Sequence, residues 1–198
     1  RDVNLRGANL AGANLTDADL TDADFCSADL TGADLTGADL TDADFYSADL
    51  AGVDLTGASG LCLYGADLSR TNLADVDLTG MNLDDANLSG VDLTGLDLTG
   101  THLNHANLAR SNLAGLDLIL VDFVGTDLAG ANLTGADLTG TSFSSANLSN
   151  ADLSNADLTG THLYKANLTR ANLSAANLTK ANLRDANLTG ADLREANL

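Results

Sequence analysis

The side chains that could carry chemistry in this chain are three His, two Cys, and 28 Asp and Glu residues. Imidazoles, thiolates and carboxylates bind metals and act as acid–base or nucleophilic groups in catalysis. Here they form no nucleophile–base–acid set, and neither a phosphate-binding G-x-x-x-x-G-K-[ST] loop nor a dinucleotide fingerprint is found. The Ca²⁺-binding nonapeptide G-G-x-G-x-D is also missing. The sequence therefore predicts a protein that is not an enzyme and has no cofactor or metal.

Composition excludes several other classes. The 198 residues include 9 Lys and Arg and carry a formal net charge of −19. Binding nucleic acid directly, or an anionic membrane surface, requires clustered cations, so neither is expected. The chain contains no apolar run of about 18 residues, which excludes a membrane-spanning segment. No targeting segment is visible, so a cytoplasmic location is favoured, with the compartment left open.

The dominant pattern is a period of five. Leu or Phe occurs at every fifth position from 5 to 55 and again from 63 to 198. If this central position is called i, then i−1 is mostly Asp or Asn, i−2 is mostly Ala, and i+1 and i+2 are mostly polar or Gly. Neither a helix nor one straight strand has a period of five. Burying every i and i−2 together requires the chain to turn every five residues, and Asp, Asn, Ser and Gly are turn-forming residues.

The repeats form one predicted domain, residues 1–198. It comprises 11 repeats over 3–57, a three-residue insert at 58–60, and 28 repeats over 61–198.

The repeats resemble the pentapeptide-repeat family. The segments A-D-L-T-G (Ala33–Gly37) and A-N-L-T-G (Ala131–Gly135) are close to the family consensus. The resemblance implies an all-β fold, a right-handed quadrilateral parallel β-helix (a solenoid) with about ten coils of 20 residues. The spacing within each of the pairs Phe25/Phe45 and Phe123/Phe143 equals that coil length.

Sorting the chain by 20-residue coils predicts an acidic ladder at i−1. Carboxylates in neighbouring coils, about 4.8 Å apart, repel by roughly 0.9 kcal/mol even in bulk water. One interpretation is a negative stripe that imitates a phosphate backbone or collects cations. The other, which is favoured, is a run of ordinary turn residues. The predicted ladder contains Asp34, Asp54, Asp77, Asp97, Asp117, Asp137 and Asp157.

A second ladder, with centres from 63 to 183, carries the i−1 residues of these repeats that are neither Asp nor Asn. It is interpreted either as a partner-docking face or as a wider side that tolerates large inner residues. The candidate face contains Tyr64, His102, His105, Val124, His162, Tyr164 and Lys165. Ile119 and Leu120 occupy normally polar positions and form a candidate exposed apolar patch.

The His and Cys residues are not expected to converge on one metal. His102 and His105 could share one side of a coil, but His162 should lie three coils away, about 14 Å. Cys26 is predicted to lie on a different ladder from Cys62. Charge is also uneven: residues 1–58 hold two Arg and twelve Asp (−10), whereas residues 159–198 hold five cations and three acids (+2).

These observations lead to three hypotheses for function. The first is a non-catalytic acidic scaffold that presents a face to another protein. The second follows from the resemblance, since some family members protect DNA gyrase from quinolones by imitating B-form DNA; here 28 acids along roughly 45 Å approach the charge spacing of duplex DNA. That hypothesis makes a topoisomerase the partner. The third is a structural spacer or a unit that assembles end to end as a homo-oligomer.

Overall fold

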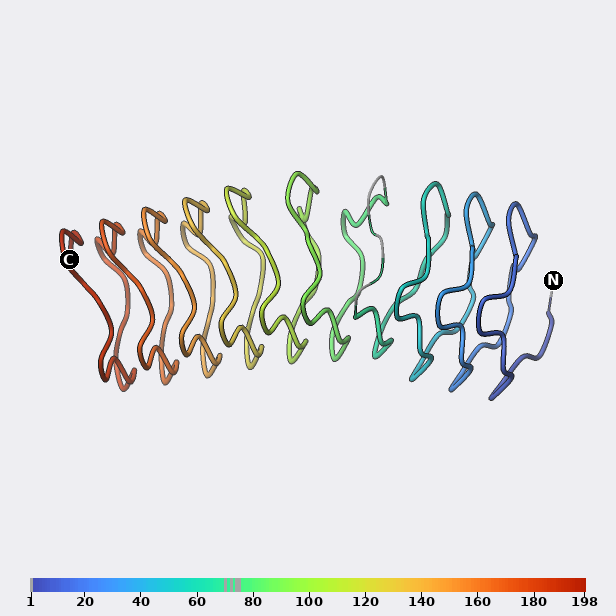
Figure 1. The fold of residues 1–198 in the computed structure, drawn as a ribbon. Coiled ribbons are helices and arrows are strands. Elements are labelled where there is room, and N and C mark those ends of the chain that lie inside the picture. The colour runs from blue at the N-terminus through green and yellow to red at the C-terminus, as the bar shows by residue number, and fades with distance from the viewer. Residues whose placement is uncertain (1, 70, 72, 74–75) are drawn as a thin grey trace.

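A computed structural model describes residues 2–69, 71, 73 and 76–198 as an elongated stack of coils with the two termini at opposite ends (Figure 1). Within these residues the backbone forms isolated parallel β-bridges joined by turns, without α-helices or longer strands. The described residues accordingly contain no helix able to cross a membrane. The chain is a β-solenoid, in agreement with the predicted all-β class.

The coils are held in register by backbone hydrogen bonds between corresponding positions of neighbouring coils. Asn147, for example, bridges Asn167. Leu148 N–H donates to the Asn167 carbonyl at 2.7 Å, and Asn147 N–H donates to the Thr126 carbonyl of the preceding coil at 2.9 Å. Each interior coil is thus bonded on both sides, and the 20-residue period suggested by the Phe spacing is observed directly.

The turns explain the polar part of the consensus. Ala151 N–H donates to the Leu148 carbonyl at 3.1 Å and closes the turn. The side chain at i−1 supports the next residues, as when Asp152 Oδ1 accepts a hydrogen bond from Ser154 N–H at 2.9 Å. Residue i+2 is left-handed, with φ of 58° at Asn150. Gly and short polar residues are favoured there because they tolerate positive φ best.

The core consists of the i and i−2 side chains. The Leu and Phe centres from Leu20 to Leu178 are buried, and Ala fills most i−2 positions. Two pairs of Phe rings stack between adjacent coils: Phe25 on Phe45 with centroids 4.8 Å apart, and Phe123 on Phe143 at 5.0 Å. Among the described residues, every buried side-chain N or O atom has a hydrogen-bond partner. The core is therefore apolar, and its few polar atoms are satisfied.

Residues 58–60 form a shortened side of the coil. Ser59 bridges Asp39 in the regular register, but the next bridge along the chain pairs Asp67 with Asp49, at a smaller separation. The repeat therefore keeps its i−2, i−1 and i positions and lacks i+1 and i+2. The predicted insert is thus a short repeat that forms a side of its own. Every later repeat therefore lies one side further around the coil than the sequence predicts.

Gly60 takes the central position of this short repeat. Its φ is 72°, and a Cβ atom there would overlap the Cα and N atoms of Thr41 in the preceding coil. Backbone atoms cannot move aside as a flexible side chain could. Only glycine therefore fits at this centre.

The i−1 residues form four ladders, and the side of a ladder comprises its repeats from i−2 to i+2. Ladder A contains Asn4, Asp24, Asp44, Cys62, Asn82, His102, Asp122, Ser142, His162 and Asn182. Ladder B contains Asn9, Asp29, Asp49, Asp67, Asn87, Asn107, Asp127, Asn147, Asn167 and Asn187. The described members of ladder C are Asn14, Asp34, Asp54, Asp92, Asn112, Asn132, Asp152, Asn172 and Asp192. Ladder D contains Asp19, Asp39, Ser59, Asp77, Asp97, Asp117, Asp137, Asp157, Asn177 and Asn197.

The prediction of one seven-residue acidic ladder is wrong at its N-terminal end. Asp34 and Asp54 lie in ladder C. The shortened side at 58–60 belongs to ladder D, and the sequence prediction did not count it as a side. The remaining five residues do follow one another in ladder D: Asp77, Asp97, Asp117, Asp137 and Asp157.

Candidate protein-binding face

Side A differs chemically from the other three sides along its whole length. It carries all four Phe, all three Tyr, all three His and both Cys residues of the chain. The Phe rings are buried, whereas Tyr and His side chains face outward. The twelve residues are Phe25, Phe45, Phe123, Phe143, Tyr46, Tyr64, Tyr164, His102, His105, His162, Cys26 and Cys62.

The structure places the predicted face on this one side. His102 and His162 are exposed members of ladder A, separated by Asp122 and Ser142, so the two imidazoles lie three coils apart as expected. His105 packs its ring over Gly125 in the next coil. The other members are Tyr64, Val124, Tyr164 and Lys165. Their role in binding stays a prediction.

The predicted apolar patch is exposed and adjoins side A. Ile119 is 41% exposed and Leu120 is 81% exposed, both in a turn of side D. Leu120 lines a shallow hollow of about 200 Å³ together with His102 and Asn104. The patch therefore extends the candidate face around one corner of the coil.

Tyr46 is a member of the face that the sequence analysis missed. The residue is 51% exposed, and its ring stacks on the ring of Tyr64 in the next coil, with centroids 5.7 Å apart and an interplanar angle of 14°. The ring lies against Gly65, where a Cβ would come within 3.0 Å of it. Tyr64 Oη donates to Asp85 Oδ2 at 2.9 Å, and this hydrogen bond raises the pKa of Tyr64.

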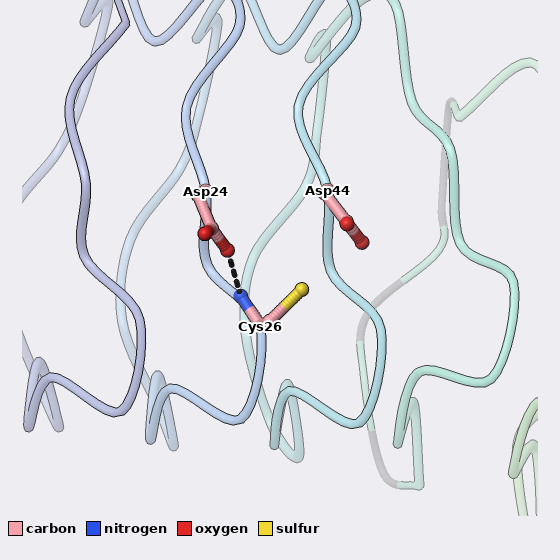
Figure 2. A group of neighbouring side chains, drawn as sticks. All are labelled: Asp24, Cys26 and Asp44. Carbon is pink, nitrogen blue, oxygen red and sulfur yellow. Dashed lines mark hydrogen bonds between the residues drawn. The ribbon is translucent and has the colours of Figure 1, made fainter.

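Asp24, Cys26 and Asp44 form a small cluster on the same side (Figure 2). One ligand atom from each lies within 4.8 Å of the others. Cys26 N–H donates to Asp24 Oδ1 at 3.0 Å, the largest cause of the lowered pKa of Asp24. Burial, aided by hydrogen bonds to both carboxylates, raises the pKa of the Cys26 thiol to about 11. A protonated thiol is a poor metal ligand, and Arg6 already pairs with Asp24 at 3.1 Å.

The predicted separation of the two Cys residues onto different ladders is wrong. Both lie on side A, because Ser47 N–H donates to the Gly65 carbonyl and so places residues 61–65 next to residues 43–47. Cys26 is buried, Cys62 is exposed, and both are free thiols. They lie two coils apart, which is too far for a disulfide between them.

Tyr164 occupies the same i+1 position of side A as Tyr64, but nearer the C-terminal end. Lys165 Nζ lies 5.0 Å from its ring centroid, and the Arg184 guanidinium of the next coil lies 5.9 Å from it. Both distances are within the range of cation–π attraction. This aromatic ring is therefore covered by the chain's own cations.

The ladder D carboxylates are held by turn chemistry. Hydrogen bonds from Thr99 hold the pKa of Asp97 below its usual range, and the repulsion from Asp77, which acts in the opposite direction, is the smallest contribution. Thr79 likewise lowers the pKa of Asp77. Since turn bonds outweigh repulsion, the geometry favours the interpretation of these residues as turn residues.

A hollow with a volume of about 510 Å³ lies on side B. Apart from one Arg, its lining consists of small residues that cannot act as an acid–base pair. The lining residues are Ala51, Ser69, Ser89, Gly90, Ala109, Arg110 and Ala129.

Comparison with known proteins agrees with this description. The family model for Pentapeptide repeats matches in eight copies, over residues 1–37, 23–59, 62–100, 92–128, 122–160 and 161–198. The chain therefore belongs to the pentapeptide-repeat family. None of the curated proteins matches it.

Two solved structures illustrate the similarity. HetL, a pentapeptide repeat protein involved in heterocyst differentiation regulation in the cyanobacterium Nostoc sp. strain PCC 7120, is 36% identical, with a TM-score of 0.69 over 99% of this chain and 87% of HetL. QnrB1, a plasmid-mediated fluoroquinolone resistance protein, is 17% identical, with a TM-score of 0.54 over 96% of this chain and 91% of QnrB1. The second similarity extends to the fold alone.

Proposed function

We propose that this chain is a non-catalytic scaffold that binds another protein through side A. The observation that carries the proposal is the placement of every aromatic, His and Cys residue of the chain on one side. Tyr is enriched where proteins bind one another, because its ring combines a large apolar area with a hydrogen-bonding group. Turn geometry alone does not require this segregation, since all four ladders share the same turns. Its similarity to HetL, a protein involved in regulation, supports a role exerted by binding.

We infer the finer architecture of the scaffold from its register. Each coil is built from four repeats and turns at each of them, which makes the β-helix quadrilateral. The 39 repeats together with the shortened side give 40 sides, or ten coils. The right-handed twist is the one implied by membership of the family. Such a rod holds side A straight and exposed along its length.

Partner capture with two matched triple variants tests the proposal. His102→Ala/His162→Ala/Tyr164→Ala removes three exposed groups of side A, and Thr94→Ala/Ser154→Ala/Ser174→Ala removes three from side C. Immobilised wild-type protein and both variants are exposed to extract from cells that express the chain, and retained proteins are identified by mass spectrometry. We expect a protein that the wild type and the side C variant retain and the side A variant loses. Equal retention by all three would contradict the assignment of side A.

A second candidate function is mimicry of DNA toward a topoisomerase. The observation that favours it is the run of five carboxylates in ladder D, from Asp77 to Asp157. A supercoiling assay with purified DNA gyrase tests it, using wild type and the variant Asp117→Asn/Asp137→Asn/Asp157→Asn. Inhibition by the wild type that the variant loses would support mimicry, whereas an unaffected gyrase would exclude it.

A further inference from the structure

The Tyr46–Tyr64 pair forms an exposed aromatic shelf on side A. Tyr46 and Tyr64 are 51% and 39% exposed, and their rings stack with centroids 5.7 Å apart, so part of the pair is open to solvent. Gly65 beneath Tyr46 and the hydrogen bond from Tyr64 to Asp85 hold the rings in place. The shelf is therefore preorganised, and a ligand would lose little side-chain entropy in using it.

A carboxylate-lined hollow adjoins the shelf at the corner between sides A and B. It has a volume of about 190 Å³, and three of its lining residues are acids. Asp85 belongs to both features, because it lines the hollow and accepts the hydrogen bond from Tyr64. The lining residues are Ser47, Ala48, Asp49, Gly65, Ala66, Asp67, Asp85 and Asn87.

The chain itself demonstrates what an aromatic ring at this position attracts. Tyr164 occupies the same i+1 position as Tyr64, and Lys165 and Arg184 cover its ring at 5.0 and 5.9 Å. Among the described residues, no Lys or Arg lies over Tyr46 or Tyr64. The nearby Arg6 is engaged with Asp24 at 3.1 Å.

We propose that the shelf and hollow together bind a basic segment of a partner protein. One Arg or Lys side chain lies over the Tyr46 and Tyr64 rings, and a neighbouring one enters the hollow among Asp49, Asp67 and Asp85. This inference rests on the proposed function, since it assigns the chemistry of the partner to one part of side A. It identifies the partner by an exposed, positively charged segment that contains at least two cations.

Charge complementarity selects this occupant. Residues 1–58 carry two Arg against twelve Asp, so the surface around the shelf attracts cations and repels nucleic acid or acidic peptides. The carboxylates that flank the rings would lose hydration without compensation beneath a purely apolar helix. A guanidinium group satisfies both features, because it stacks on aromatic faces and donates paired hydrogen bonds to carboxylates.

Fluorescence anisotropy with a labelled peptide of alternating Gly and Arg tests the inference at about 150 mM salt, where long-range attraction is screened. The shelf variant is Tyr46→Ala/Tyr64→Ala, and its matched control is Tyr164→Ala. The hollow variant is Asp49→Asn/Asp67→Asn/Asp85→Asn, and its control, with the same change in net charge, is Asp117→Asn/Asp137→Asn/Asp157→Asn. Circular dichroism and the unfolding midpoint establish that each variant is folded, and Tyr46→Phe/Tyr64→Phe provides a version that keeps both rings.

We expect the shelf and hollow variants each to weaken peptide binding about tenfold and the controls less than about twofold. The Phe version should retain most of the affinity, and a peptide with citrulline in place of Arg should not bind. Equal weakening by both charge variants, or unchanged binding by the shelf variant, would overturn the inference and indicate attraction to net charge alone. If the binding of spermidine depends on the shelf and the binding of the peptide does not, the site takes free polyamines instead.

The two proposals can fail separately. If a captured partner depends on His102, His162 and Tyr164 while the peptide ignores the shelf, the scaffold stands and the basic-segment inference is wrong. If peptide binding depends on the shelf but side A retains no partner, the basic-segment inference stands and the assignment of side A as a partner-binding face is wrong. Sedimentation at rising concentration identifies the case in which the basic C-terminal region of a second copy is the occupant, which would also overturn the assignment to a different protein.

Discussion

Tyr64 and Tyr164 occupy equivalent positions on side A, yet their surroundings have opposite charge. The two rings are separated by five steps of the 20-residue register. Tyr64 donates to Asp85, and its neighbour in the preceding coil is another ring, Tyr46. Tyr164 lies beneath Lys165 and Arg184. The N-terminal region thus leaves its aromatic rings open among carboxylates, whereas the C-terminal region covers its ring with cations.

This difference shows how coils of similar backbone structure can present different binding chemistry. The turns after both Tyr residues are alike, with φ of 63° at Gly65 and 57° at Lys165. The bridges differ, because His162 bridges both neighbouring coils whereas no bridge is found at Cys62. Three side-chain positions also differ: i+2 is Gly65 or Lys165, i+1 of the next coil is Asp84 or Arg184, and i+1 of the preceding coil is Tyr46 or Ser144. In a solenoid, each coil therefore determines the ligand chemistry of its neighbour.

The largest expected effect concerns the shortened side, which determines how the N-terminal coils are aligned with the coils that follow residue 60. Gly60→Ala would place a Cβ onto the Thr41 backbone, so we expect a loss of roughly 3 kcal/mol or more in the free energy of unfolding. Gly140→Ala is the matched control, because its φ is 70° but no atom lies within 4 Å of the added Cβ. Its cost should be about 1 kcal/mol. Urea denaturation of both variants measures the difference, and equal losses would show that backbone overlap is not limiting.

The shortened side is also where prediction from the sequence failed. The five-residue period was sufficient to predict the buried Leu and Phe centres and the turns, whereas the 20-residue register was implied by the family resemblance, with which the Phe spacing agrees. It did not identify Gly60 as a centre, because the pattern was recognised by its large apolar residue. The spacing from Leu55 to Gly60 is nevertheless five, and Ala58 and Ser59 fit i−2 and i−1. Treating 58–60 as a bulge displaced the pairing by one side and hid the contact between Tyr46 and Tyr64.

The candidate site was predictable only where its residues lie in repeats that are not separated by the shortened side. Tyr64, His102 and Tyr164 were placed correctly because the repeats from 61 onward are regular. The shelf and its hollow join coils on both sides of the shortened repeat, so a sequence pattern alone could not bring Asp49 next to Asp67. Ring stacking and side-chain coverage also depend on rotamers, which a period does not specify.

Exchange of the three differing positions should convert one region into the other. Ser144→Tyr/Lys165→Gly/Arg184→Asp uncovers Tyr164 and reproduces the residues beside Tyr64, so we expect a second peptide site. Its affinity should be roughly tenfold weaker than that of the shelf, since Asn147 and Asn167 stand where the hollow has Asp49 and Asp67. Adding Asn147→Asp and Asn167→Asp should strengthen it. Calorimetry reports the stoichiometry, and a folded variant that still binds one peptide would contradict the equivalence of the two positions.

A smaller effect is expected at the exposed apolar patch between these regions. Leu120 is 81% exposed and has φ of 63°, a conformation that Gly adopts more readily. Leu120→Gly should therefore raise the free energy of unfolding by about 0.5–1 kcal/mol. If the patch contributes to side A, the same variant should lose captured partner while gaining stability. Thermal unfolding together with partner capture separates the two effects, and a loss of stability would show that Leu120 has a packing role.

The smallest expected effect compares two carboxylates of ladder D. Asp97 lies between two carboxylates, Asp77 and Asp117, whereas Asp157 has Asp137 on one side and on the other accepts a hydrogen bond from Asn177 Nδ2 at 3.2 Å. Asp97→Asn keeps a turn acceptor but makes it neutral, and because the turn bonds outweigh the repulsion, the urea midpoint should fall slightly near neutral pH. Asp157→Asn relieves repulsion from one neighbour only and also makes the acceptor of the Asn177 bond neutral, so its midpoint should fall further.

Acidification should reduce this difference in stability between wild type and Asp97→Asn. Hydrogen bonds from Thr99 lower the pKa of Asp97 from its usual 3.8, so the folded protein binds the proton less readily than the unfolded chain. The resulting contribution to stability is present above pH 3.8 and is lost as the pH falls through the lowered pKa. Asn does not titrate, so the deficit of the variant should be smaller at about pH 3 than at about pH 7. A deficit that grows on acidification would mean that repulsion within ladder D, and not the turn bonds, governs these carboxylates.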